Sequence, residues 1–391
     1  MWVDDDACIK CSLCTSVCPV YAKDMQFPGP KTLGPDWWRR IQQLGNPEDY
    51  DEFVDNCTFC QLCEAACPVG VPVAHLIAEH KIRKPKPLIR KWRDYVLAHP
   101  HWIAKFPQLT KVPRSLAKAL GLSTKITWPK KNFPRDNKLQ HDRQRFSNAV
   151  GLLVDCYSRG FDGAVVDSAR SLLELWGYDV FVVPESSLCC GAAAYAGGNR
   201  ELGYQIALDM ASQIFDQEGH FEILVTLNAT CDSTLREEWR RYWHLSLPFS
   251  VMPFQEFALA YAPVSFWQQI RGYSTENDNL TYYVHTTCRS RVSRGSGLLD
   301  QLAEKAGFRY ESLALDCCGA AGSYAFKVEH EELAKQMGMV TLNVGRLIVD
   351  SGTCALHLRQ TTGLEARHPA FWLYRAYLQS KERNEITNAT S

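Results

Sequence analysis

The sequence contains one short stretch twice, as Cys189-Cys190-Gly191-Ala192-Ala193 and again as Cys317-Cys318-Gly319-Ala320-Ala321. The two copies begin 128 residues apart, which indicates an internal duplication. Neighbouring cysteines do not easily form a disulfide with each other, and each doublet is flanked at a distance by single cysteines. The pattern therefore predicts two sites of the same kind, each built to bind a metal.

The composition limits the class of protein. The chain has 391 residues and sixteen cysteines, and its basic and acidic residues balance to a formal net charge of zero. This length predicts two or three domains. The chain opens without the basic and apolar stretches of an export signal, and no run of about eighteen apolar residues predicts a membrane-spanning helix. In a reducing compartment, clustered cysteines bind metal more often than they form disulfides.

The first eighty residues contain the pattern Cys-x2-Cys-x2-Cys-x3-Cys-Pro twice, at 8–19 and at 57–68. This is the ligand pattern of ferredoxins with two [4Fe-4S] clusters, in which the fourth cysteine of each run binds the other cluster. The predicted ligands of the first cluster are Cys8, Cys11, Cys14 and Cys67, and those of the second are Cys57, Cys60, Cys63 and Cys18. Two structural zinc sites are the alternative, but zinc usually takes its ligands from widely split pairs.

The segment between the two cysteine runs is longer than a compact ferredoxin needs. Prolines and glycines at 27–35 predict an ordered turn. Asp36 is predicted to be the N-cap of a helix that carries Trp37, Trp38, Ile41 and Leu44. These features favour a helix-rich ferredoxin-like domain over residues 1–80.

A basic connector is predicted at 81–146. Between 81 and 145 there are eighteen Lys and Arg against three Asp, an excess of fifteen positive charges. Apolar and aromatic residues lie between these bases, at Trp92, Trp102, Phe106, Leu109, Leu116, Leu120, Leu122 and Trp128. Four prolines interrupt the short helical stretches, at Pro100, Pro107, Pro113 and Pro129. One interpretation is a solvated connector that wraps over acidic domains. The other is contact with the headgroups of an anionic membrane, which is favoured over nucleic acid as an external partner.

After residue 147, short apolar strands alternate with amphipathic helices, and the alternation occurs twice. The predicted strands lie at 149–156, 179–184 and 223–227 in the first unit, and at 280–285, 310–315 and 347–350 in the second. The predicted helices of the first unit lie at 168–176 and 200–216. In the second unit one helix is predicted to end at residue 307, another to lie at 329–340, and a C-terminal helix to lie at 370–378.

The predicted fold is α+β and multidomain. A helix-rich two-cluster ferredoxin-like domain at 1–80 and the connector at 81–146 precede two duplicated cysteine-rich α/β domains of βαβαβ form, at 147–275 and 276–391.

The cysteines of both α/β units follow predicted strands. Because ligands of open parallel sheets bind beyond the carboxyl ends of the strands, four cysteines should converge in each unit. The first set is Cys156, Cys189, Cys190 and Cys231, and the second is Cys288, Cys317, Cys318 and Cys354. The alternatives are zinc or metal-free redox thiols, and redox thiols would need exposure and lowered pKa values.

These motifs resemble a known family. The paired units resemble the cysteine-rich (CCG) domains of heterodisulfide reductase B subunits, and the first segment resembles the C subunit of that enzyme. The phrases at 27–31 (FPGPK), 34–36 (GPD) and 317–327 (CCGAAGSYAFK) are similar to the C-subunit family of anaerobic glycerol-3-phosphate dehydrogenases. The resemblance covers almost the whole chain and all sixteen cysteines.

The resemblance implies an electron-transfer subunit of an oxidoreductase. Such a subunit passes electrons from a flavoprotein dehydrogenase partner to a quinone, as part of a hetero-oligomer that is peripheral on the cytoplasmic face of the membrane. The chain has no G-x-G-x-x-G after a strand and no P-loop motif, so it is not expected to bind flavin, nicotinamide or ATP itself.

The sequence departs from the fullest family pattern at two positions. Heterodisulfide reductase domains have a Cys-x2-Cys pair at the last site, which supplies five sulfurs to a non-cubane cluster, but Asn228 and Ser351 stand here three residues before Cys231 and Cys354. Four thiolates suffice for one ordinary cluster. Each CCG site is therefore predicted to bind one further iron-sulfur cluster, either a cubane or a non-cubane [4Fe-4S].

Three histidines are candidate ligands, and a packing role is favoured for each of them: His357, His285 and His244. No catalytic residue is assigned. The leading hypothesis is an electron-transfer subunit. The alternatives are a catalytic subunit that acts on a disulfide or thiol, an iron-sulfur subunit of a glycolate- or lactate-type 2-hydroxy acid oxidase, and a docking scaffold with structural clusters.

Overall fold

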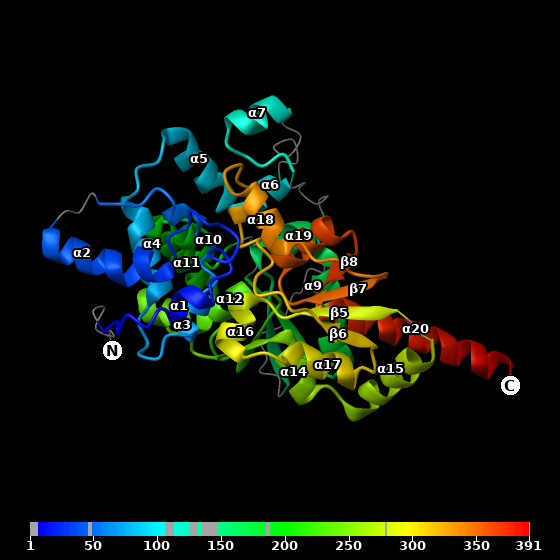
Figure 1. The fold of residues 1–391 in the computed structure, drawn as a ribbon. Helices are drawn as coiled ribbons and strands as arrows, with labels where there is room; N and C mark the ends of the chain where they lie inside the picture. The colour runs from blue at the N-terminus through cyan, green and yellow to red at the C-terminus, as the bar shows by residue number, and fades with distance from the viewer. Residues whose placement is uncertain are drawn as a thin grey trace.

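A computed structural model describes residues 7–45, 49–105, 113–125, 132–134, 148–184, 188–277 and 280–390. In Figure 1 the N-terminal helices lie at the left, the connector helices at the top, and the second sheet and the C-terminal helix at the right. None of the helices within these ranges is long and apolar enough to span a membrane.

The ferredoxin-like part is built from short helices around the two cysteine runs. They are α1 (Leu13–Ser16), a π-helical turn (Thr32–Asp36), α2 (Trp37–Leu44), a 3-10 turn (Val54–Asn56), α3 (Leu62–Ala65) and α4 (Val73–Arg83). The domain is helix-rich, as predicted, but the prediction of Asp36 as an N-cap is wrong. Its side chain caps no helix and forms an ion pair with Lys31, because the chain already turns helically from Thr32.

The connector continues as α5 (Leu88–Leu97), α6 (Pro100–Lys105) and α7 (Arg114–Ala119). α5 contacts α10, and α6 contacts α8. Of the predicted connector residues, Phe106, Pro107, Leu109, Trp128 and Pro129 lie outside the described ranges.

The first α/β unit is a parallel sheet in the order β2-β1-β3-β4. Its elements are β1 (Ala149–Leu153), α8 (Cys156–Phe161), α9 (Gly163–Leu175), β2 (Asp179–Val183), α10 (Ala192–Ala196), α11 (Arg200–Phe215), β3 (Ile223–Thr226), α12 (Ala229–Ser233), a π-helical turn (Thr234–Glu238), α13 (Trp239–Tyr242), β4 (Ser250–Pro253), α14 (Phe254–Tyr261) and α15 (Val264–Asn277).

The second unit repeats this topology, in the order β6-β5-β7-β8. Its elements are β5 (Thr281–His285), α16 (Cys288–Arg294), α17 (Leu298–Lys305), β6 (Tyr310–Ser312), a 3-10 turn (Tyr324–Phe326), α18 (Glu331–Gly338), β7 (Gly345–Val349), α19 (Gly352–Thr362), β8 (Glu365–Arg367) and α20 (Pro369–Thr390).

The structure corrects the predicted units in three ways. Each sheet has a fourth parallel strand, β4 or β8, which the sequence pattern did not predict because these strands are only three or four residues long. The first strand ends at Leu153 rather than at Cys156, since Asp155 accepts hydrogen bonds from the backbone of Tyr157 and Ser158 and so starts α8. α20 extends to Thr390, well beyond the predicted end at 378.

The two α/β units share one hydrophobic core. Leu152 of β1, Tyr282 of β5 and Trp372 of α20 belong to the same cluster of buried side chains. α20 packs against α9 and α15, both in the first unit, while the Trp372 indole donates a hydrogen bond to the Leu347 carbonyl of β7 (2.9 Å). The C-terminal helix therefore ties both sheets together, which fixes the carboxyl ends of their strands relative to each other.

Candidate iron-sulfur sites

The first predicted ferredoxin set surrounds a hollow of about 320 Å³, whose walls include Cys8, Cys11, Cys14 and Cys67. Cys67 comes from the second cysteine run. Burial, followed by the neighbouring thiols, raises the pKa of Cys14. The arrangement brings together the four cysteines that the spacing predicted.

The second ferredoxin set surrounds a hollow of about 300 Å³ lined by Cys18, Cys57, Cys60 and Cys63. Here the fourth cysteine, Cys18, comes from the first run. Burial raises the pKa of Cys60 to about 12, with Cys288 as the next contribution. The exchange of fourth cysteines between the two runs is therefore present in the fold.

The backbone around each run is held in an unusual conformation. The residues on both sides of the second cysteine have positive φ, at Lys10 and Ser12 (59° and 63°) and at Phe59 and Gln61 (56° and 65°). Left-handed backbone costs about 1–2 kcal/mol for a residue with a side chain. Such conformations persist where the surroundings enforce them and gather at functional sites. The strain turns successive thiols toward one hollow.

The first CCG set is drawn from three separate segments. The thiols are neighbours that influence one another's pKa, from Cys156 to Cys189, from Cys189 to Cys190 and from Cys190 to Cys231. Cys156 is the first residue of α8, and Cys231 lies in the short helix α12. Both helices follow strands of the same parallel sheet, which explains why residues far apart in sequence meet.

The second CCG set has the same arrangement. Cys288 contacts Cys317, and Cys318 contacts Cys354. The backbone N–H groups of Gly319 and Ala320 donate to the thiols of Cys317 and Cys318, at 3.5 and 3.4 Å. Hydrogen bonds to sulfur ligands are among the features that set the potential of iron-sulfur clusters.

The glycine of each doublet is required by the backbone. Gly191 and Gly319 have φ of +84° and +82°. A Cβ would lie 2.2 Å from the Gly203 carbonyl oxygen at the first position and 2.3 Å from the Ala334 carbonyl oxygen at the second. Only glycine fits such a close approach at positive φ. The repeated Cys-Cys-Gly sequence thus has a structural cause in both domains.

The donor chemistry of all four sites fits iron-sulfur clusters. Fifteen of the sixteen thiols are buried or half-buried, and Cys11 alone is exposed. Within the described ranges, no three Cys, His, Asp or Glu side chains converge as tightly as a single metal ion needs. The ferredoxin sets surround hollows instead, and each thiol of a cluster site binds its own iron. The ligand assignment of the individual cysteines remains a prediction.

The ferredoxin-like part lies directly against the second CCG site. Cys60 interacts electrostatically with both Cys288 and Cys317. α16, which begins at Cys288, packs against α3, which carries Cys63 (Figure 1). The second ferredoxin set is therefore the neighbour of the second CCG site.

A buried polar node joins the three cysteine-bearing domains. Arg289 of α16 forms an ion pair with Glu238 of the first unit. Gln61 of the ferredoxin-like part donates to the same carboxylate at 3.0 Å. Arg289 also interacts electrostatically with Cys288 and with Cys190. One guanidinium thus lies between the two CCG sites.

Sequence reasoning missed this node. Arg289 directly follows Cys288, and this adjacency was the only available signal. The spacing of Gln61 and Glu238 gives no sign that they meet, because 177 residues separate them.

The two positions that lack a fifth sulfur face each other. The Ser351 hydroxyl donates to the Asn228 side-chain carbonyl at 3.3 Å, and the Ala229 N–H donates to the Asp350 carbonyl at 3.0 Å. Asn228 also accepts from the Thr230 N–H and so caps α12. At the positions where the family pattern has sulfur, this chain has a polar contact between its two halves.

The three candidate histidines have different surroundings. His357 contacts the Ala334 carbonyl through Nε2 at 2.9 Å. His285 is fully buried, and burial lowers its pKa to about 3. His244 is exposed. The contact of His357 supports a packing role.

Comparison with known proteins agrees with this geometry. The family described as a 4Fe-4S dicluster domain matches residues 4–71, and the cysteine-rich domain family matches residues 150–236 and 282–359. The chain is an iron-sulfur protein with paired cysteine-rich domains. The family resemblance inferred from the motifs is thereby confirmed.

Named relatives of this iron-sulfur protein cover most of its length. It is 24% identical to the C subunit of anaerobic glycerol-3-phosphate dehydrogenase from Escherichia coli (strain K12), over 94% of this chain and 98% of the relative. It is 22% identical to an uncharacterized iron-sulfur protein of Methanococcus maripaludis, over 90% of this chain and 67% of the relative. A shorter match, 35% identical, joins 19% of this chain to 16% of lactate utilization protein B from Macrococcus caseolyticus.

Proposed function

We propose that this protein is the electron-transfer subunit of a membrane-associated flavin dehydrogenase complex of the glycerol-3-phosphate dehydrogenase type. A flavoprotein partner oxidises the substrate, and this chain carries the electrons to a quinone. The name of the E. coli relative, which aligns over almost its full length, supports both the dehydrogenase class and the multisubunit assembly.

The observation that carries the proposal is the continuity of the cysteine sets. Cys60 of the ferredoxin-like part interacts with Cys288 and Cys317, and Arg289 lies between Cys288 and Cys190. Clusters with a structural role would not need to lie close together. Redox centres that act in series must lie close together, because electrons pass only between neighbouring centres.

The cysteines have defined roles in this proposal. Two [4Fe-4S] clusters are bound by the two ferredoxin sets, and one further iron-sulfur cluster is bound by each CCG set. Bound clusters supply one-electron transfer. The chain's own residues hold the thiols in place, exclude water through buried side chains such as Phe59 and Tyr195, and donate N–H hydrogen bonds to sulfur.

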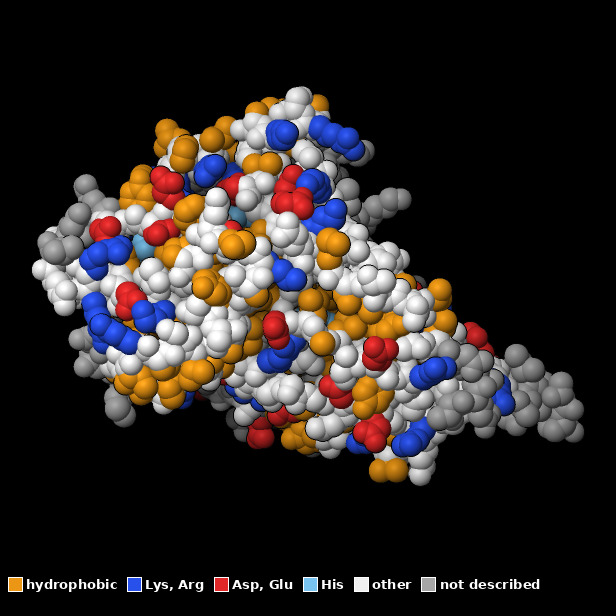
Figure 2. Space-filling view, viewed as in Figure 1, with side chains coloured by type: hydrophobic (Ala, Val, Ile, Leu, Met, Phe, Trp, Pro, Cys, Tyr) orange, Lys and Arg blue, Asp and Glu red, His pale blue; other side chains and the backbone are white. Residues whose placement is uncertain are grey.

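The connector supplies the proposed membrane contact. α5 exposes Leu88, Ile89, Trp92 and Tyr95, with exposed fractions between 40% and 83%. Figure 2 shows hydrophobic side chains beside Lys and Arg over the region of α5 and α7. Aromatic and basic side chains together suit the interfacial region of an anionic bilayer. These features support a peripheral location on the cytoplasmic face of the membrane.

Part of the connector's charge has an internal use. Arg93 is buried and pairs with Glu329, and Lys125 pairs with Glu332. The interpretation of a connector wrapped over acidic residues therefore applies to these side chains. It does not account for the apolar face of α5.

The proposal is tested by anaerobic purification of the full chain, metal and sulfide analysis, and a redox titration followed by electron paramagnetic resonance. We expect iron and sulfide in stoichiometric amounts, and centres that are reversibly reduced between the potentials of flavin and quinone. Dithionite-reduced protein should then be reoxidised by menadione, a quinone without an isoprenoid tail. Stoichiometric zinc without iron, or centres that do not change oxidation state in this range, would contradict the proposal.

The catalytic alternative, in which a CCG site acts on a disulfide, finds no support in this fold. The fifth sulfur is replaced at both sites, and Asn228 and Ser351 bind each other. A glycolate- or lactate-type complex differs from the proposal only in the flavoprotein partner. Identification of the flavoprotein that copurifies from the native host decides between these substrates.

A further inference from the structure

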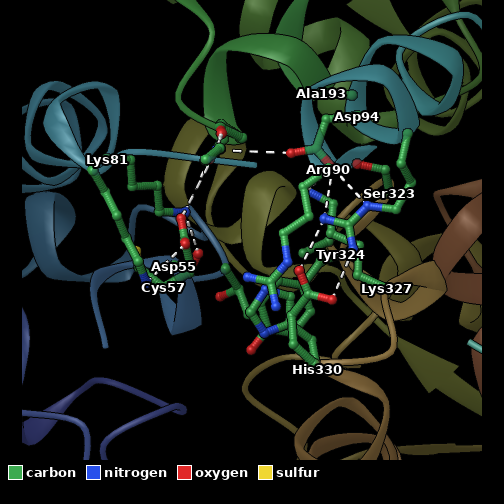
Figure 3. Close-up of a pocket in the computed structure, with 18 of the residues that line it drawn as sticks. Asp55, Cys57, Lys81, Arg90, Asp94, Ala193, Ser323, Tyr324, Lys327 and His330 are labelled. Carbon is green, nitrogen blue, oxygen red and sulfur yellow. Dashed lines mark hydrogen bonds and ion pairs between the residues drawn. The ribbon is translucent and has the colours of Figure 1, made fainter. Parts of the chain in front are cut away.

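A polar pocket lies at the junction of all parts of the chain (Figure 3). It is partly open to solvent and has a volume of about 550 Å³. Its walls come from the ferredoxin-like part at Cys57 and Lys81, from the connector at Arg90, and from the segments that follow the two doublets, at Ala193 of α10 and at Ala321. The backbone at Gly322 lies close to Ala193, since a Cβ added at Gly322 would be 3.8 Å from that of Ala193.

The pocket has an excess of positive charge. Three acidic residues line it, Asp55, Asp94 and Glu329, against six basic ones, Lys81, Lys84, Lys86, Arg90, Arg93 and Lys327. Three of the basic residues are deeply buried, with exposed fractions of 3% for Lys81, 2% for Arg93 and 7% for Lys327. Buried cations are normally matched by anions. Lys84, Lys86, Arg93 and Lys327 share the three carboxylates in ion pairs, so the basic side chains exceed the acidic ones by three charges.

One buried polar atom in the walls lacks a partner among the described residues. It is Nδ1 of His330, whose side chain is only 4% exposed. The His330 ring is held flat against Tyr324, with centroids 4.1 Å apart. Buried polar groups normally have hydrogen-bond partners. The position of Nδ1 in the wall of a charged pocket indicates that a ligand supplies its hydrogen-bond partner.

Arg90 is the basic residue with the most freedom. It is half-buried, and no described residue forms an ion pair or side-chain hydrogen bond with its guanidinium. The other basic residues make internal contacts, such as the Lys81 ammonium with the carbonyls of Cys57 and Ala196. Figure 3 shows Arg90, Lys81 and Lys327 on the walls of the same hollow. A guanidinium in this position suits bidentate binding of an oxyanion.

We propose that this pocket binds a small anion with phosphate or carboxylate groups and at least two negative charges. Arg90 binds the anion directly, Lys81 and Lys327 neutralise it, and His330 supplies a hydrogen bond. The ligand contacts the ferredoxin-like part and both cysteine-rich domains at once, so its binding stabilises their junction.

The anion has two possible sources. α5 lines the pocket with Arg90 and presents Leu88, Ile89 and Trp92 to the outside. A phosphate group can therefore arrive on a soluble molecule or as the headgroup of a lipid in the membrane that α5 contacts. The pocket recognises the same phosphate group in both cases.

The test is calorimetric titration of the full, cluster-loaded chain with inorganic phosphate and with citrate, at constant ionic strength maintained with chloride. We expect saturable binding of one anion per chain and a rise in the thermal midpoint. Arg90→Gln should weaken this binding by at least about tenfold, since a charge-assisted hydrogen bond is worth about 1.5 kcal/mol or more. His330→Phe, which keeps a ring against Tyr324 but removes Nδ1, should weaken it about threefold.

Lys91→Gln is the matched control. Lys91 neighbours Arg90 on α5 but is exposed and does not line the pocket. It should bind phosphate within about twofold of the wild type. Equal weakening by Arg90→Gln and Lys91→Gln, or binding that chloride alone reproduces, would overturn the proposal.

Vesicles distinguish the two sources. If the ligand is a lipid headgroup, phosphatidylcholine vesicles with phosphatidic acid should compete with inorganic phosphate, and vesicles without phosphatidic acid should not. If the ligand is soluble, neither vesicle competes. Because binding is measured without electron transfer, failure of this proposal leaves the proposed function untouched, and failure of the redox titration leaves the pocket intact.

Discussion

The ferredoxin-like part and the paired cysteine-rich domains bring cysteines together in different ways. In the first region, three of the four thiols of each set come from one short run, and strained backbone beside Cys11 and Cys60 turns them toward a hollow. In the second region, strands of a parallel sheet deliver thiols from distant segments. The first arrangement closes around two hollows, and the second is built on sheets that share a hydrophobic core.

Removal of iron should have the largest effect, because it should unfold the ferredoxin-like part and leave the cysteine-rich domains folded. The ferredoxin-like part has short helices and two hollows at its centre, so metal binding supplies much of its folding free energy. Chelation of iron under reducing, anaerobic conditions should abolish hydrogen-exchange protection in α1 and α3. Protection in β1 and β5, which lie in the shared core, should persist. Equal loss of protection in both regions would break the comparison.

Substitution of a doublet glycine tests the second region. Gly319→Ala places a Cβ 2.3 Å from the Ala334 carbonyl oxygen at a φ of +82°, so the backbone must move. We expect a loss of about 4 kcal/mol in the free energy of unfolding. Gly177→Ala is the control, because Gly177 also has positive φ (+88°) but open space around it. It should cost only about 1 kcal/mol, and chemical denaturation measures both.

The polar node between the two regions should have a slightly smaller effect. Glu238→Gln removes the charge that compensates buried Arg289, and breaking a buried pair costs about 3 kcal/mol. In this variant the second CCG site should lose iron more readily than the first ferredoxin set, and iron analysis and paramagnetic resonance can follow the loss. Glu237→Gln changes the adjacent, less buried carboxylate and should shift stability by less than about 0.5 kcal/mol. If both variants behave alike, the node has no special role.

The free energy of unfolding should depend on pH through a histidine of the ferredoxin-like part. His80 is fully buried, accepts from the Asp51 N–H at 2.8 Å and stacks on Trp37. Burial lowers the pKa of His80 to about 4, so the folded state favours the neutral ring. The contribution of neutral His80 to the free energy of unfolding is complete above the unfolded pKa of about 6.5. It is lost as the pH falls toward 4, and about 1.4 kcal/mol is lost by pH 5.5.

His80→Gln removes this dependence. The stability difference between the wild type and the variant should therefore narrow as pH falls from 7 to 5.5 in denaturant titrations of the loaded protein. A constant difference over this range would assign the effect of His80 to packing alone.

The sequence predicted the parts of the fold that rest on local pattern. The ferredoxin spacing and the alternation of strands and helices both identified real elements, because each is specified by residues close together. The short strands β4 and β8 were missed because three or four residues carry no reliable periodicity. The cap at Asp36 was predicted wrongly because tertiary packing extends the helix backward to Thr32.

The site was predictable to a similar extent. Which cysteines converge follows from spacing and from the strand-end rule, and the structure brings each set together. The contacts between sets could not be predicted, since Gln61, Glu238 and Arg289 meet only after three domains have packed. The pocket at Arg90 and His330 also depends on residues from four separate segments.

In the proposed function, the cysteine sets form one continuous series of redox centres. The most direct test is the magnetic interaction between centres in the fully reduced protein, measured by paramagnetic resonance at several temperatures and microwave powers. We expect spin coupling between the centre at Cys57, Cys60 and Cys63 and the centre at Cys288 and Cys317, and loss of that coupling in Cys288→Ser. Centres that relax independently in the wild type would contradict the series.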